Sequence, residues 1–154
     1  MISERGIAAH FRSGTVCVRP CFAEELILNA VPVISIIDDD ESIRVGLNNL
    51  VISLEYTSCT FASAEAFLQS MELHTSWCVI ADVRMPAMSG VELQSRLRSE
   101  GYAVPFIFIT ALPDESSRKQ AISDGAICFL TKPFEEGALI KCLNTAVQAH
   151  RHSS

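Results

Sequence analysis

The chain has 154 residues, of which 49% are hydrophobic, and its formal net charge is −6. This length suits one domain with a substantial core and is short for two. A nucleic-acid-binding domain usually has a basic face, so the acidic balance gives no reason to expect contact with nucleic acid.

Residues 1–31 show no sustained hydrophobic periodicity. Residues 22–30 fit a short helix bracketed by Pro20 and Pro32. We treat 1–31 as an N-terminal extension of unknown role, 32–149 as the folded domain and 150–154 as a short tail.

From Val33 onward the pattern becomes regular. Short apolar runs predict strands at 33–37, 78–81, 104–109 and 127–130, and a more polar strand, suited to a sheet edge, is predicted at 56–61. The helices between them are indicated by apolar spacing and by capping residues. The first helix has Ile43, Leu47, Leu50, Val51 and Leu54 on one face, and the last has Leu139, Leu143, Ala146 and Val147.

The inner helices begin and end at recognisable residues. Ser63 is predicted to cap a helix carrying Phe67, Leu68 and Met71, and Ser89 with Glu92 has the form of a capping box. Asp114 is expected to cap the next helix, and Gly125 suits its left-handed end. Strands that are apolar on both faces and alternate with helices belong in a parallel sheet that helices cover on each side. Right-handed crossovers then give an open, doubly wound α/β fold.

The six cysteines give no metal-binding pattern. Cys17 and Cys21 are three residues apart, but no second pair completes a site. No apolar run approaches the about 20 residues that a membrane span needs, and the N-terminus lacks the apolar core of a secretory signal. We therefore expect a cytoplasmic protein without membrane contacts, whose cysteines are unpaired thiols.

Polar residues follow the predicted strands where a parallel sheet binds its ligands, beyond the carboxyl ends. Asp38 to Glu41 follow the first strand, Asp82 the third, Thr110 the fourth and Lys132 the fifth. Caps of the first helix account for part of the acidic run but not for Asp82. Carboxylates at one edge repel each other unless a cation lies among them, and Mg²⁺ prefers such oxygen ligands. A site that handles phosphoryl groups and a structural acidic cluster both fit these residues.

Four motifs, in this order and at these strand ends, resemble the receiver domain of bacterial two-component response regulators. The resemblance covers about 33–148, and its motifs are Ile36-Ile37-Asp38-Asp39, Ile80-Ala81-Asp82-Val83-Arg84-Met85-Pro86 with Met88-Ser89-Gly90, Phe108-Ile109-Thr110-Ala111, and Phe129-Leu130-Thr131-Lys132-Pro133-Phe134. It implies a flavodoxin-like five-stranded parallel sheet of order 2-1-3-4-5 with five helices.

The resemblance also implies a role for each matching residue. Asp82 would be the phosphoacceptor, and Lys132 and Thr110 would contact phosphoryl oxygens. Mg²⁺ would be bound by Asp39 and Asp82, by Asp38 through water, and by the main-chain carbonyl of Arg84. The Arg84 side chain is then free to influence the phosphoryl lifetime, and the bond before Pro133 is a candidate cis peptide.

The implied output is a conformational switch. Movement of Thr110 would open space for Phe129, although Phe129 read by itself is a plain core aromatic. This changes the face made by the fourth helix, fifth strand and fifth helix. The implied activity is Mg²⁺-dependent self-phosphorylation with slow autodephosphorylation, so the chain is not expected to be an enzyme.

Two alternatives stay open at this point. Asp38 and Asp40 after an apolar strand are similar to the haloacid-dehalogenase-like phosphatases, but that pattern leaves Asp82 unexplained and lacks a later acidic pair at a strand end. The chain could also be a docking module of receiver fold that works without phosphorylation. Turnover of a phosphate ester would identify the first, and an Asp82→Ala variant that keeps its function would identify the second.

The implied partners are a histidine kinase and a downstream protein target or phosphotransfer protein. The motif sequence around Arg84 and Ser89 is similar to receivers joined to a LuxR-type helix-turn-helix, but few residues follow the last predicted helix. The chain is then either a stand-alone receiver, which we expect, or a piece cut from a longer regulator. Ile140 and Cys142 lie off the main apolar stripe of that helix. They suggest a contact surface and, as one option, a phosphorylation-dependent homodimer.

Overall fold

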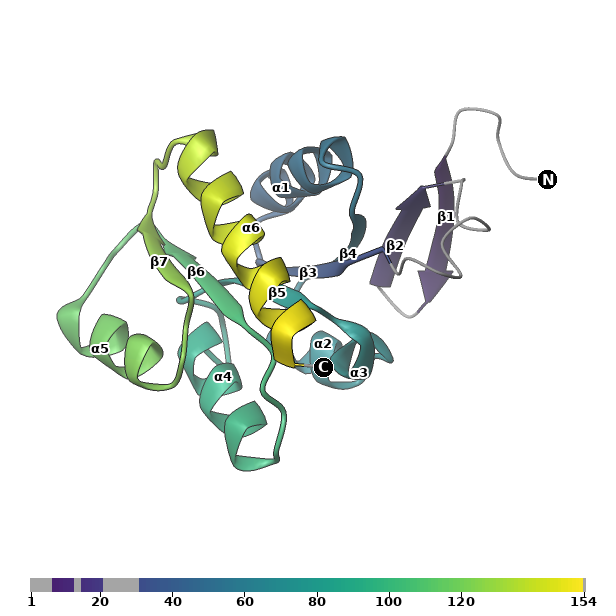
Figure 1. The fold of residues 1–154 in the computed structure, drawn as a ribbon. Coiled ribbons are helices and arrows are strands. Elements are labelled where there is room, and N and C mark those ends of the chain that lie inside the picture. Colours follow the sequence, from purple (N-terminus) through teal and green to yellow (C-terminus); the bar gives the residue numbers. More distant parts are fainter. Residues whose placement is uncertain (1–6, 13–14, 21–30, 154) are drawn as a thin grey trace. The chain divides into compact units, whose positions relative to one another are not determined.

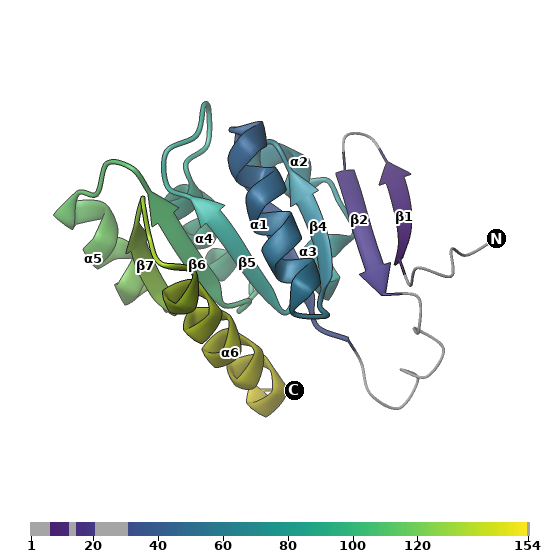
Figure 2. The ribbon, with the colours of Figure 1, turned by 90° about the horizontal axis from the view of Figure 1, so that it is seen from above.

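The computed structural model describes residues 7–12, 15–20 and 31–153. The chain divides into two compact units, Met1–Ser76 and Trp77–Ser154. Each unit contains strands with helices packed on them (Figures 1 and 2). The predicted helix at 22–30 lies outside the described residues.

The N-terminal unit is built on strands in the order β1-β2-β4-β3. The pair β3–β4 is parallel, whereas β2 is antiparallel to both of its neighbours. Helix α1 covers one face of the β3–β4 pair, and α2 and α3 lie on the other (Figure 1). Its elements are β1 Ile7–Arg12, β2 Thr15–Pro20, β3 Val33–Ile37, α1 Glu41–Ser53, β4 Thr57–Phe61, α2 Ala64–Leu68 and α3 Glu72–Thr75.

The hairpin of β1 and β2 is the part of this unit that sequence patterns missed. Residues 16–18 pair with 58–60, so β4 lies between β2 and β3, and its predicted place at a sheet edge is wrong. Val16 and Val18 alternate with other residues directly after a Ser-Gly dipeptide at 13–14, and this pattern is typical of the second strand of a hairpin. That pattern is short, which is why it does not register as sustained periodicity.

The C-terminal unit contains three parallel strands in the order β5-β6-β7. Helices α4 and α5 lie on one face of these strands, and α6 lies on the other (Figures 1 and 2). The elements are β5 Cys78–Asp82, α4 Gly90–Ser99, β6 Phe106–Thr110, α5 Glu115–Ser123, β7 Cys128–Thr131 and α6 Glu136–Ser153. Every residue of β5 and β6 is buried, as expected for strands covered on both faces.

The predicted helix ends agree with the structure. Ser63 and Asp114 cap their helices, Ser89 and Glu92 form a full capping box, and Gly125 has φ +96°. The described residues contain six helices rather than five, because the helix predicted after Ser63 is divided into α2 and α3. The break lies just after α2, where the hydroxyl of Ser70 donates to the main-chain carbonyl of Phe67.

Four cysteines are paired in two disulfides, Cys17–Cys59 and Cys128–Cys142, so the prediction of unpaired thiols is wrong for them. Cys17 and Cys59 are direct partners across the β2–β4 pair, with 4.0 Å between their Cα atoms. Cys142 is only 5% exposed, so its predicted part in a contact surface is also wrong. Cys78 is a buried free thiol.

No helix in the described part of the chain combines the length and the apolar character that crossing a bilayer requires. Helix α6 is the longest, with 18 residues, and it continues past the predicted domain boundary at 149. Its buried residues include Leu139, Leu143, Ala146 and Val147, which confirms the predicted apolar stripe.

Candidate functional site

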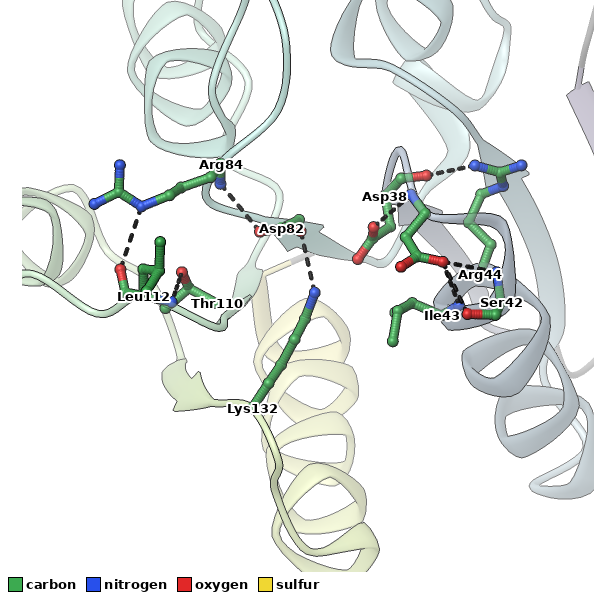
Figure 3. A network of polar contacts seen from close by, with 10 residues as sticks. Asp38, Ser42, Ile43, Arg44, Asp82, Arg84, Thr110, Leu112 and Lys132 are labelled. Atoms are coloured by element: carbon green, nitrogen blue, oxygen red, sulfur yellow. Dashed lines mark hydrogen bonds and ion pairs between the residues drawn. The ribbon is translucent and has the colours of Figure 1, made fainter.

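In the N-terminal unit, Asp38 and Asp39 follow β3 directly. The main-chain N–H of Asp38 donates to the carbonyl of Phe61 at 3.1 Å, which fixes it beside the end of β4. The Asp38 side chain is buried, and its Oδ1 accepts the main-chain N–H of Asp40 at 2.9 Å. Arg44 donates to the Asp38 carbonyl at 2.7 Å (Figure 3). Asp39 is exposed.

The cap of α1 is made by Asp40. Its Oδ1 accepts the main-chain N–H groups of Ser42 and Ile43 and the hydroxyl of Ser42 (Figure 3). An acceptor here satisfies donors of the first helical turn and suits the positive end of the helix dipole. The role of a helix cap is therefore confirmed for Asp40, and Asp38 and Asp39 remain the predicted ligands of a cation.

In the C-terminal unit, Asp82 is the last residue of β5 and is 8% exposed. The Nζ atom of Lys132 lies 3.1 Å from its Oδ2, and the main-chain N–H of Arg84 donates to its Oδ1 at 3.0 Å. Figure 3 shows both groups directed at the Asp82 carboxylate. The structure thus brings together two predicted site residues that are 50 positions apart in the sequence.

Thr110 is fully buried at the end of β6. Its Oγ1 accepts the main-chain N–H of Leu112 at 3.2 Å, and its carbonyl accepts the main-chain N–H of Lys132 at 2.8 Å. The second bond ties the segment after β7 to the end of β6. The Lys132–Pro133 peptide bond is cis, as predicted.

The loop between β5 and α4 folds back onto the strand end. The N–H of Gly90 donates to the carbonyl of Val83 at 3.0 Å. A Cβ atom at Gly90 would collide with the Asp82 carbonyl oxygen and lie 3.1 Å from the Phe108 ring. This close approach explains why glycine stands there.

The Arg84 side chain links this loop to the loop after β6, a connection that the sequence does not reveal. Its Nε donates to the carbonyl of Leu112 at 3.3 Å (Figure 3). Its guanidinium lies 3.5 Å from Asp114 Oδ2. The pKa of Asp114 is lowered, first by hydrogen bonds from Ser117 and to a smaller extent by the Arg84 charge. Both side chains of the ion pair are exposed, so the pair itself contributes little stability.

Phe129 lies in β7, and its ring is tilted against that of Phe108 with 6.2 Å between centroids. It is half-buried, unlike the fully buried Phe108. A half-buried aromatic next to a core aromatic has room to move outward, and it is also ordinary packing at the end of a sheet. Phe129 therefore stays a predicted switch residue.

The C-terminal unit combines a carboxylate, an ammonium group and a hydroxyl at the ends of neighbouring strands. The carboxylate can act as a nucleophile, and the lysine can stabilise negative charge that arrives with a phosphoryl group. The hydroxyl of Thr110 accepts one hydrogen bond and can still donate its own hydrogen. These groups suit phosphoryl transfer to Asp82.

Comparison with known proteins gives consistent matches. A family model described as the response regulator receiver domain matches residues 34–144. The chain is 41% identical over 116 residues to response regulator protein TmoT of Ectopseudomonas mendocina, covering 75% of this chain and 53% of that protein. It is 35% identical over 115 residues to transcriptional regulatory protein FixJ of Bradyrhizobium diazoefficiens, covering 75% and 56%. The chain spans about half the length of the curated relatives that it matches.

Solved structures agree with these matches. The response regulator StyR has a TM-score of 0.75 and 40% identity, covering 80% of this chain and 63% of that chain. The crystal structure of FixJ-N has a TM-score of 0.69 and 31% identity, covering 77% of this chain and 95% of that chain. The predicted flavodoxin-like fold is confirmed, and the orders β4-β3 and β5-β6-β7 are the two parts of the predicted order 2-1-3-4-5.

Proposed function

Since this chain belongs to the response regulator receiver domain family of phosphorelay signal transduction, we propose that Asp82 accepts a phosphoryl group from a histidine kinase. The observation that carries the proposal is the position of Asp82 at the end of a buried strand, with Lys132 Nζ 3.1 Å from its carboxylate. A lysine in this position balances the charge of the unphosphorylated aspartate and can bind a phosphoryl oxygen after the transfer.

In the transfer step, an oxygen of Asp82 attacks the phosphorus of the phosphorylated kinase histidine. The new O–P bond forms as the N–P bond breaks, and the electron pair of that bond leaves with the histidine ring. The product is an acyl phosphate on Asp82. Lys132 stays beside the added charge, and Thr110 donates its hydroxyl hydrogen to a phosphoryl oxygen.

The donor set also fits Mg²⁺, which takes carboxylate and carbonyl oxygens. Asp39 and Asp82 would bind the ion directly, Asp38 through water, and Arg84 through its main-chain carbonyl. Bound Mg²⁺ would neutralise charge on the phosphoryl oxygens. This assignment rests on the family and on the chemistry of these residues, and the Mg²⁺ dependence of phosphorylation tests it.

The output of the proposed switch is a changed surface for protein binding. Phosphorylation draws Thr110 toward the new oxygens, Phe129 moves into the space this leaves, and the face of α5, β7 and α6 changes. The partner is a downstream protein or a phosphotransfer protein in the cytoplasm, or a second copy of the chain. The acyl phosphate then hydrolyses slowly, so the chain is a phosphoacceptor rather than an enzyme.

Intact mass after incubation with acetyl phosphate tests the proposal. Wild-type protein should gain one phosphoryl group with Mg²⁺ and none with Mg²⁺ removed, and Asp82→Ala should gain none. Asp124→Asn is the matched control, because Asp124 bonds to Ser95 and Gln120 rather than to the candidate site. It should behave as wild type.

Two results would contradict the proposal. Wild-type protein that gains no adduct, from acetyl phosphate or from a histidine kinase, would instead be a docking module. Sustained release of phosphate from an ester substrate would identify a phosphatase.

A further inference from the structure

The disulfide between Cys128 and Cys142 lies within the part of the chain that the proposed switch must move. It joins β7 to α6, and 6.1 Å separate the two Cα atoms. The loop that the bond closes has a sequence separation of 14 and contains Phe129 and Lys132. The bond therefore constrains a segment that holds both the switch aromatic and the phosphate-binding lysine.

The two joined elements differ in how firmly they are held. Residues 128–130 of β7 are half-buried and Thr131 is exposed. Helix α6 is anchored by Leu139 and Leu143, which are fully buried, and it packs on β5 and β6. A covalent bond to a firmly packed helix restricts the looser strand more than the helix.

The two thiols also differ in access, in a way that suits a reversible reaction. Cys128 is half-buried, whereas Cys142 is 5% exposed. Cys128 is therefore the thiol that meets an external reagent, and Cys142 is the one that completes the bond. By contrast, Cys78 is fully buried in β5, and burial raises the pKa of its thiol, which makes it unreactive.

We propose that Cys128 and Cys142 form a redox-controlled bridge that limits the movement of β7 on phosphorylation. This inference rests on the proposed function. The reduced form switches fully, and the bridged form holds Phe129 near its unphosphorylated position. Disulfides in a reducing compartment are typically transient and regulatory, which suits such a role.

The oxidant in this proposal is a low-molecular-weight disulfide such as oxidised glutathione. The Cys128 thiolate attacks one sulfur of the oxidant, forms a mixed disulfide and releases one reduced thiol. The Cys142 thiolate then attacks the Cys128 sulfur, and the second reduced thiol leaves. Two protein thiols are oxidised, one oxidant disulfide is reduced to two thiols, and the two protein protons pass to the departing thiolates.

Hydrogen exchange on the full chain tests the bridge and the switch together. The protein is equilibrated with oxidised glutathione or with dithiothreitol, then incubated with or without acetyl phosphate and Mg²⁺. Intact mass gives the adduct, and peptide mass gives the bridge. In reduced protein, phosphorylation should change deuterium uptake in peptides covering 128–142, and in bridged protein this change should be at least threefold smaller.

Two variants separate this bridge from the other one. Cys128→Ala removes the accessible thiol and leaves only the buried Cys142, so this variant should respond equally in both redox conditions, like reduced wild type. Cys59→Ala removes the Cys17–Cys59 bond instead and should keep the redox dependence.

Each contrary result has a separate meaning. Equal uptake changes in bridged and reduced protein would overturn the inference and leave the phosphoacceptor proposal standing. Absence of a 128–142 bridged peptide after oxidation would do the same. Absence of any phosphoryl adduct in both redox states would overturn the phosphoacceptor proposal, and the inference with it.

Discussion

At Gly90, the first turn of α4 and the end of β5 come so close that a side-chain carbon has no room. The atoms that a Cβ would meet are the carbonyl oxygen of Asp82 and the ring of Phe108. The carbonyl belongs to the proposed phosphoacceptor, and the ring belongs to the core. A side chain at Gly90 would therefore disturb the packing and the position of Asp82 together.

We predict that Gly90→Ala lowers the free energy of unfolding by about 1–3 kcal/mol, the usual range for overpacking. It should also slow phosphorylation by acetyl phosphate. Urea denaturation and intact mass measure the two effects. Gly46→Ala is the control, because nothing lies within 4 Å of a Cβ in that helix position. It should raise the free energy of unfolding by about 0.5–1 kcal/mol, and a Gly90 variant that behaved the same way would contradict the predicted collision.

His150 gives a prediction about pH. Its ring stacks on Trp77 with 4.4 Å between centroids, and the Arg151 guanidinium lies 5.3 Å from the Trp77 ring centre. Burial lowers the pKa of His150, so the unfolded chain binds a proton at a higher pH than the folded chain does. The stabilisation is therefore complete above the unfolded pKa of about 6.5 and is lost as the pH falls below it.

The expected result is that wild type loses more stability than His150→Phe between pH 7.5 and 5.5. Phenylalanine keeps a ring to stack on Trp77 and cannot be protonated. Urea denaturation followed by Trp77 fluorescence measures both proteins at each pH. Parallel losses in the two proteins would show that His150 does not carry the dependence.

At the scale of single elements, α1 ends with a residue that is poorly suited to its backbone. Leu54 is the C-cap, and Glu55 after it has φ +68°. The left-handed region costs a residue with a Cβ about 1–2 kcal/mol, and glycine adopts it freely. We predict that Glu55→Gly raises the free energy of unfolding by about 0.5–1 kcal/mol after the greater entropy of glycine in the unfolded chain is subtracted.

Chemical denaturation of wild type, Glu55→Gly and Glu55→Ala tests this explanation. The Glu55 side chain is exposed, so the alanine variant controls for its removal. Alanine keeps the Cβ and should give no gain. If both variants gain equally, the effect comes from the lost carboxylate rather than from the backbone.

The elements that the sequence predicts well are those whose periodicity reports burial. Strand β3 is observed where it was predicted, and β6 is shifted by one or two residues, because continuous apolar runs leave few other choices. Strand β4 was misplaced at an edge because Thr57 and Ser58 are polar, yet both are buried. Which strands pair across a sheet depends on distant residues, and the amphipathicity of one segment does not report it.

At the scale of the whole molecule, the same distinction separates the predicted from the unpredicted parts of the site. Asp82 and Lys132 could be paired in advance because the carboxyl ends of parallel strands meet at one edge. The hydrogen bond from the Arg84 side chain to the carbonyl of Leu112 could not be predicted, because it depends on the path of two loops. The disulfides depend on the β2–β4 register and on how α6 lies along the sheet, neither of which sequence spacing fixes.

The predicted division of the chain, with 1–31 as an extension and 32–149 as the receiver, leads to a final prediction. The hairpin of β1 and β2 precedes the region that the family model matches, and it is fastened by the β2–β4 ladder and by Cys17–Cys59. A bond with a sequence separation of 42 contributes up to about 4 kcal/mol in the chain-entropy picture. We therefore expect a chain lacking residues 1–31 to fold, to be less stable by a few kcal/mol, and still to be phosphorylated on Asp82.

The full-length variant Cys17→Ala separates the two contributions of the hairpin. Under oxidising conditions it should lose about 2–4 kcal/mol relative to wild type, and with dithiothreitol present the two should unfold alike. The truncated chain loses the ladder as well, so it should remain less stable than wild type in dithiothreitol. A truncated chain without a cooperative unfolding transition would instead make the hairpin part of the folding unit, because β4 then needs a partner on both sides.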